Sequence, residues 1–166
     1  QFIYERITQG RDFNPDRFER TTLRNIKMQA GTTGPIWKSI VLSADADGCE
    51  EGKGLTIEFK LFESEKRLEM AFQMRKEREE DAEACYVALP FQLEGGKIIY
   101  EAQGGLVTPG KNQIPGSSSD WHTVQNFTTI RNESSQIITA SAQAPLVQFG
   151  EINLGKWQYI AHVEKP

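Results

Sequence analysis

The sequence predicts an all-β fold, an antiparallel β-sandwich, and three observations support this fold class. Apolar and polar residues alternate along residues 54–76 on both sides of a polar break. Short apolar segments recur along the rest of the chain, separated by glycine, proline and asparagine turn signals. No segment shows helical periodicity over a convincing length. A series of strands without helices between them is typical of a sandwich rather than of a βαβ fold.

The clearest predicted element is a hairpin over residues 54–76. Each of its arms carries an apolar residue at every second position. These residues are Leu55, Ile57, Phe59, Leu61, Leu68, Met70, Phe72 and Met74. Because successive side chains of a strand point to opposite faces, the period of two predicts two antiparallel strands with one buried face.

The segments before the hairpin predict a lead-in arm and two further strands. Residues 1–22 form a polar arm that opens with a short strand at residues 1–7 and continues as a charged connection with one helical turn after Pro15. A strand is expected to start at Leu23. After a turn over the next glycines, residues 36–44 predict another strand, and its large apolar groups on both faces suit an interior position in a sheet.

The segments after the hairpin predict a loop and a further set of strands. Residues 76–83 are a charge run and predict a solvated loop. Residues 84–93 are the most apolar stretch and predict a central strand with a bend at Pro90, which cannot donate to a ladder. Further strands are expected at residues 97–102, 122–131, 135–142, 146–150 and 157–163. Residues 1–166 are thus predicted to form a single domain of ten or eleven short strands.

Bulk composition excludes some partners. The net charge of −4 argues against nucleic acid, whose phosphates require a basic face. No apolar run approaches the ~20 residues that cross a bilayer, so no membrane partner is expected. Cys49 and Cys85 are 36 positions apart without a CxxC motif, and two buried free thiols are favoured over a single disulfide.

Two segments partly match metal- or phosphate-binding motifs, but their residue spacing or residue types do not fit. The acidic loop that begins at Asp45 has glycine at its fourth position, where an EF-hand needs glycine at the sixth. Residues 105–111 match the start of a P-loop, but Asn112 replaces the magnesium-binding Ser or Thr, and a Pro-Gly pair stands where the helix should begin. The only histidines are His122 and His162, too few for a zinc site without other ligands. The sequence therefore predicts no catalytic residue and no metal site.

One polar and aromatic segment is a candidate binding site. It contains Asp120, Trp121, His122 and Gln125, on a loop that a sandwich scaffold would hold in place. An aromatic face with polar neighbours is a common way to hold a sugar ring, and it also suits a domain interface. The simpler interpretation is that Trp121 fills the end of the core and Asp120 caps the turn.

Four motifs carry a resemblance to a known family. They are ALPF at residues 88–91, EAQGG at 101–105, QIPGSSSDWHTVQ at 113–125 and APLVQFG at 144–150. In order and spacing they resemble the C-terminal region of bacterial proteins of glycoside hydrolase family 38, the α-mannosidase family. The opening residues QFIYE resemble the segment that leads into that region. The resemblance implies a galactose-mutarotase-like β-supersandwich, or part of one.

The resemblance also implies a function. A chain of this kind is a non-catalytic C-terminal β-sandwich domain that supports a catalytic domain of the same polypeptide and contacts glycan. The family's carboxylate nucleophile and zinc belong to an N-terminal α/β domain, and no stretch here matches the nucleophile motif or the His-x-Asp zinc pair. We therefore expect a piece excised from a larger glycosidase, inactive alone and without a cofactor of its own, whose partner is the missing catalytic domain.

Two other functions stay open on the sequence. A free-standing carbohydrate-binding module would use the same aromatic and polar loop. A mutarotase-type enzyme would need a histidine and a glutamate facing one cleft, and only His122 and His162 could supply the histidine.

Overall fold

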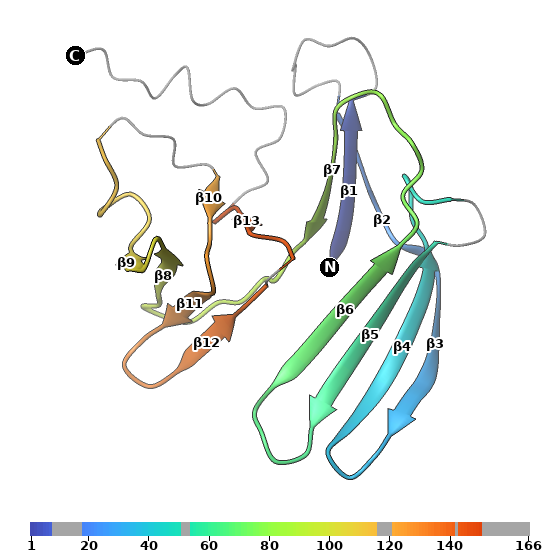
Figure 1. Cartoon of the computed structure of the whole chain (residues 1–166), viewed down its shortest axis with the longest axis horizontal. Helices are drawn as coiled ribbons and strands as arrows, with labels where there is room; N and C mark the ends of the chain where they lie inside the picture. Colours follow the sequence, from blue (N-terminus) through green and yellow to red (C-terminus); the bar gives the residue numbers. More distant parts are fainter. Residues whose placement is uncertain (8–17, 51–53, 116–120, 142, 151–166) are drawn as a thin grey trace. The chain divides into compact units, whose positions relative to one another are not determined.

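The computed structural model is all-β, with several antiparallel sheets (Figure 1). It describes residues 1–7, 18–50, 54–115, 121–141 and 143–150. Within these ranges every regular element is a strand, and no helix long and apolar enough to span a membrane occurs there. The chain divides into two compact units, the first with the described residues up to Ala88 and the second with those from Leu89. That both units belong to one sandwich domain stays a prediction.

The first unit contains a four-stranded antiparallel sheet in the order β3-β4-β5-β6 (Figure 1). Its strands are β3 (Arg24–Thr33), β4 (Trp37–Asp45), β5 (Leu55–Phe62) and β6 (Leu68–Met74). The predicted hairpin is confirmed, because β5 and β6 pair from Leu55 opposite Met74 to Leu61 opposite Leu68. Strand β4 lies between β3 and β5, which confirms its predicted interior position.

Strand β3 continues through residues that the sequence predicted as a turn. The register shifts between Ala30 and Thr33, which marks an irregularity in this edge strand. Gly31 lies within this segment, where a Cβ atom would clash with the hydroxyl of Ser39. The absence of a side chain therefore lets β3 approach β4 closely, and the turn itself comes later, at residues 34–36.

The first unit also contains a three-stranded antiparallel sheet in the order β2-β1-β7. Its strands are β1 (Phe2–Ile7), β2 (Phe18–Thr22) and β7 (Glu83–Val87). The predicted strand at residues 1–7 is confirmed. Strand β2 lies in the segment predicted as a charged connection, and the helical turn expected after Pro15 lies outside the described residues. Strand β7 is an edge strand rather than a central one, and it ends before Pro90, which has no N–H to continue a ladder.

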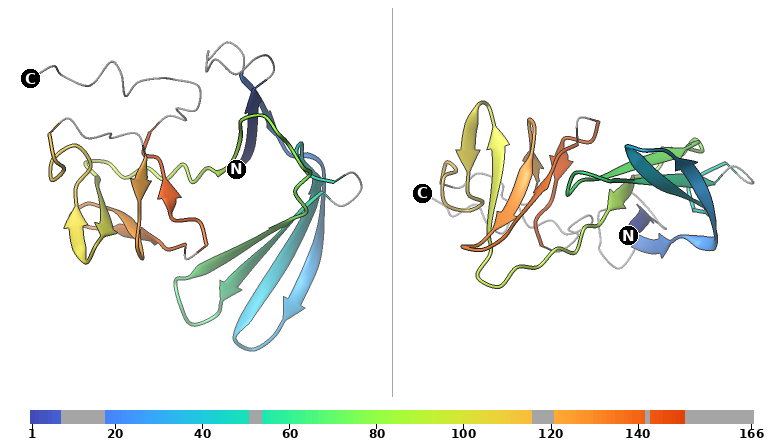
Figure 2. Two further views of the ribbon diagram at one scale, coloured as in Figure 1. Left: turned by 45° about the horizontal axis from the view of Figure 1, so that its top comes forward. Right: turned by 90° about the horizontal axis from the view of Figure 1, so that it is seen from below.

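Buried side chains of the first unit join these two sheets, whose ribbons Figure 2 shows in two further views. Phe2 and Tyr4 from β1 pack with Leu55 and Ile57 from β5. Leu23, the single residue between β2 and β3, packs against the same cluster. The described part of the predicted polar arm therefore includes two strands and supplies buried aromatic side chains.

The second unit contains a four-stranded sheet and a two-stranded ladder. The four-stranded sheet has the order β12-β11-β8-β9, and the ladder pairs β10 with β13. The strands are β8 (Lys97–Ala102), β9 (Gly105–Val107), β10 (His122–Thr123), β11 (Thr128–Arg131), β12 (Gln136–Thr139) and β13 (Leu146–Val147). The predicted strand at 97–102 is confirmed, whereas the one at 122–131 is two strands in different sheets. The strand expected at 157–163 lies outside the described residues.

Candidate functional site

The segment predicted to bind carbohydrate or a domain is part of a short ladder in the second unit. Asp120 lies outside the described residues, and the description resumes at Trp121. His122 in β10 pairs with Val147 in β13, and the Val124 amide donates a hydrogen bond of 2.8 Å to the Pro145 carbonyl. Residues 122–124 are thus held against the APLVQFG motif by backbone hydrogen bonds.

The His122 side chain is buried between two aromatic rings. It is 3% exposed, and its Nδ1 atom lies 3.1 Å from the Tyr100 hydroxyl oxygen. The imidazole centroid is 4.8 Å from that of Tyr100 and 5.1 Å from that of Phe149. An imidazole enclosed in this way packs and orients its neighbours, and it presents no surface to a sugar ring.

Trp121 and Gln125 remain at the surface of the same unit. Trp121 is 39% exposed, and Gln125 is also exposed. The Gln125 side-chain oxygen accepts a hydrogen bond of 3.2 Å from the Gly104 amide, and the Gln125 amide donates one of 2.9 Å to the Glu101 carbonyl. Asn126 donates a further bond of 2.8 Å to the Glu101 carboxylate. Among the described members of the predicted site, Trp121 and Gln125 are the ones that a ligand could reach.

The structure brings together three of the motifs that carry the family resemblance. Glu101 and Gly104 of the EAQGG motif bond to Gln125, at the end of the long DWHTVQ motif. That motif in turn pairs with APLVQFG through β10 and β13. The sequence did not single out Tyr100, Glu101 or Asn126 as neighbours of the site. The only sign of them in the sequence is that each lies within or directly next to one of the motifs.

An exposed apolar face on the sheet of the first unit is the second candidate for function. Leu55, Ile57 and Leu61 fall at alternate positions of β5 and therefore share one face of the sheet. Leu55 is 1% exposed beneath β1, whereas Leu61, at the other end of the strand, is 63% exposed. The hairpin's predicted buried face is thus buried at one end only.

Apolar side chains are exposed on this face in all four strands, and the charged Lys38 is paired with Leu61 among them. Cross-strand pairing places these apolar side chains in adjacent rows. We call this set the apolar face, and it comprises Met28, Ile40, Leu61 and Leu68, each at least 44% exposed. A group of exposed large apolar side chains on one face of a protein typically marks an interaction site.

The titratable groups of the described residues do not assemble a metal centre. Within the described ranges, no group of three or more His, Cys, Asp and Glu side chains is placed to hold an ion. Both cysteines are free, but only Cys49 is buried, so the prediction of two buried thiols is wrong for Cys85. Burial raises the pKa of the Cys49 thiol, which lowers its reactivity near neutral pH.

Comparisons with known proteins identify no family for this chain. No family model, no curated protein and no solved structure matches the chain. The fold and the site therefore define an all-β protein with several antiparallel sheets.

Proposed function

We propose that the chain is a non-catalytic β-sandwich domain of an α-mannosidase-like glycoside hydrolase. In this role it packs against the catalytic domain of the same polypeptide, which holds the zinc, and it contacts glycan through Trp121 and Gln125. The order and spacing of the four sequence motifs support the family, and the finer galactose-mutarotase-like supersandwich belongs to the same proposal.

The observation that carries the packing role is the apolar face. Leu61 and Leu68 are directly paired across β5 and β6, and both remain exposed although their strands carry the pattern of a buried face. Each fully buried side chain of this type contributes about 1.5–3 kcal/mol relative to the exposed state. Another domain that covers the face would bury these side chains, and the free energy gained by burial would favour docking.

The contacts of the predicted binding segment support a secondary role in glycan binding. Trp121 and Gln125 are accessible, and Gln125 is fixed by its bonds to residues of the EAQGG motif. A free-standing carbohydrate-binding module would use these same two residues, and it is the alternative to the packing role.

Activity measurements test the proposal. The isolated chain should release no product from aryl α-mannosides, because it lacks the nucleophile and zinc motifs. The polypeptide encoded by the complete gene should hydrolyse them and lose activity with a chelator. Chelator-sensitive turnover by the isolated chain would contradict the non-catalytic role.

Paired variants in the complete polypeptide separate packing from glycan contact. Leu61→Glu with Leu68→Glu should lower its thermal stability and activity, because two carboxylates would be buried at the interface. The matched control is Leu106→Glu with Ile138→Glu, at two exposed apolar residues of the second unit. Equal effects of the two pairs, or a gene that encodes no catalytic domain, would favour the carbohydrate-binding module.

A further inference from the structure

The face of the β3–β6 sheet opposite the apolar face is polar and hollowed. Cross-strand pairing aligns Gln29, Val41, Glu58 and Ala71 in one row across the four strands. The next row pairs Thr56 with Gln73. Because these residues alternate with the apolar set along each strand, their side chains point away from the core of the unit.

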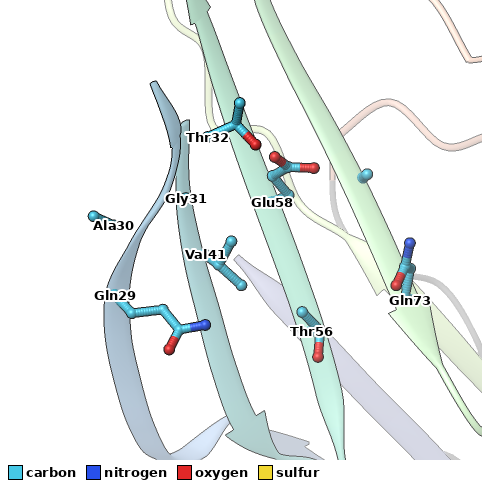
Figure 3. Close-up of a pocket in the computed structure, with 9 residues that line it drawn as sticks. Gln29, Ala30, Gly31, Thr32, Val41, Thr56, Glu58 and Gln73 are labelled. Carbon is cyan, nitrogen blue, oxygen red and sulfur yellow. The ribbon is translucent and has the colours of Figure 1, made fainter. Parts of the chain in front are cut away.

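A pocket of about 320 Å³ lies on this polar face. Figure 3 shows Val41 with Gln29, Thr56, Glu58 and Gln73 around it. Small residues keep it open, since Gly31 and Ala71 contribute no bulky side chain to its lining. Its volume is at the lower end of the roughly 300–1,000 Å³ that is typical of small-molecule sites, which suits a single ring.

The polar groups around the pocket are not used to hold the fold together. The side chains of Gln29, Thr56 and Gln73 make no hydrogen bond to any other residue in the described part of the chain. Two amides and a hydroxyl therefore face the pocket with their donors and acceptors available.

The charges at the pocket nearly cancel. Glu58 is the one ionised group among the lining residues. Its carboxylate Oε2 lies 3.7 Å from the Lys60 Nζ, two residues along the same strand and on the same face. No cationic side chain lines the pocket itself, and besides Lys60 this face carries Lys27, in the row of Thr56 and Gln73. The two amides and the hydroxyl are therefore the groups that would hold a ligand, and they suit a neutral one.

We propose that this pocket binds one ring of a neutral oligosaccharide. Vicinal hydroxyls of a sugar ring match amides that both donate and accept and a carboxylate that accepts. The Val41 and Ala71 side chains offer an apolar base for the C–H groups of the ring. This binding does not depend on the packing role proposed above, because the pocket and the apolar face lie on opposite sides of the sheet.

Chemical-shift mapping on the full 166-residue chain tests the site. The neutral probes are α-1,2-mannobiose, maltose and cellobiose, and mannose 6-phosphate is the anionic comparison. We expect at least one neutral probe to shift amide resonances of residues 29–32, 41, 56–58 and 71–73, with a Kd on the order of 1 mM from a few hydrogen bonds at an open site. Mannose 6-phosphate should bind more weakly than the neutral probes.

Variants at the exposed Gln73 and the half-buried Glu58 then assign the contacts. Gln73→Ala and Glu58→Gln should each weaken the binding about threefold to tenfold, the effect of losing one hydrogen bond. Gln143→Ala, at an exposed glutamine of the second unit outside the predicted binding segment, is the matched control and should leave it unchanged.

The outcomes separate this proposal from its competitors. Shifts that map to residues 121–125 and vanish in Gln125→Ala would overturn it in favour of the site in the second unit. No shift from any neutral probe, or tighter binding of mannose 6-phosphate, would also overturn it. None of these results bears on docking through the apolar face, which the activity of the complete polypeptide tests separately.

Discussion

Glu5 is a charged residue inside the first unit, and its burial makes its partner important. The side chain is 1% exposed, and its Oε1 atom accepts a hydrogen bond of 2.6 Å from the Arg20 Nε. The two residues are direct cross-strand partners in β1 and β2. Burying a carboxylate is costly unless such a partner compensates it, so this pair fixes β2 against β1.

Arg20→Ala should therefore destabilise the chain strongly. Loss of the guanidinium leaves the buried Glu5 carboxylate without its cation, and we expect the free energy of unfolding to fall by about 3–5 kcal/mol in urea melts. Arg6→Ala is the matched control, because Arg6 and Glu19 are exposed cross-strand partners with an N–O distance of 3.6 Å. That control should cost no more than about 1 kcal/mol. Similar small losses in both variants would contradict the role given to Glu5.

Tyr86 predicts a loss of stability at high pH. Burial, and then the nearby Glu5 carboxylate, raise the pKa of Tyr86 to about 12, against the smaller opposing effect of Arg20. In the unfolded chain a tyrosine ionises near its ordinary pKa of about 10. The folded state thus keeps a proton that the unfolded state loses, so the stabilisation is complete below pH 10 and disappears as the pH rises towards 12.

Urea melts across this pH range provide the measurement. The wild-type free energy of unfolding should decline between about pH 10 and pH 12, and Tyr86→Phe should decline less steeply because it has no phenol to ionise. Tyr4, whose pKa is also raised by burial and by its hydrogen bond to Glu83, leaves some decline in that variant. Identical slopes for the two proteins would show that Tyr86 is not the group responsible.

At the scale of the element, strand β5 changes from buried to exposed along one face. Leu55 and Leu61 are both leucines on the same face of β5, and they differ in whether β1 covers them. Leu55→Ala should cost about 2–5 kcal/mol of unfolding free energy. Leu61→Ala should stay within about 0.5 kcal/mol in the isolated chain. Equal costs in thermal or urea melts would mean that the apolar face is covered in the isolated chain.

The alternation of residues predicted the hairpin elements well but not what covers them. A period of two tells which residues of β5 and β6 share a face, and their observed register agrees with it. It carries no information about how far β1 extends over that face. The central position predicted for residues 84–93 was wrong, because β7 pairs with β1 about 80 positions away and local alternation does not reveal such a partner. Strand β2 was missed because its five residues, FERTT, carry little apolar signal.

At the scale of the whole molecule, residue alternation and the turn signals between short apolar segments predicted the all-β class. The candidate site was predicted only in part. The sequence identified Trp121, His122 and Gln125 from their local combination of aromatic and polar groups. It could not separate the buried His122 from the exposed Trp121, because burial of the imidazole depends on Tyr100 and Phe149 from distant segments. The polar pocket on β3–β6 was not foreseen, since its residues are unremarkable singly and meet only through strand register.

The central claim is that the apolar face is a docking surface for a catalytic domain, and cysteine labelling tests it directly. Leu61→Cys, at the end of the apolar face next to the β5–β6 turn, should react quickly with a maleimide in the isolated chain. In the polypeptide encoded by the complete gene, the same cysteine should react at least about tenfold more slowly, because the docked domain covers it. Gln73→Cys, on the polar face, is the control and should react at one rate in both, with peptide mass spectrometry separating these sites from Cys49 and Cys85. Equal labelling of Leu61→Cys in the isolated chain and in the complete polypeptide would contradict the account.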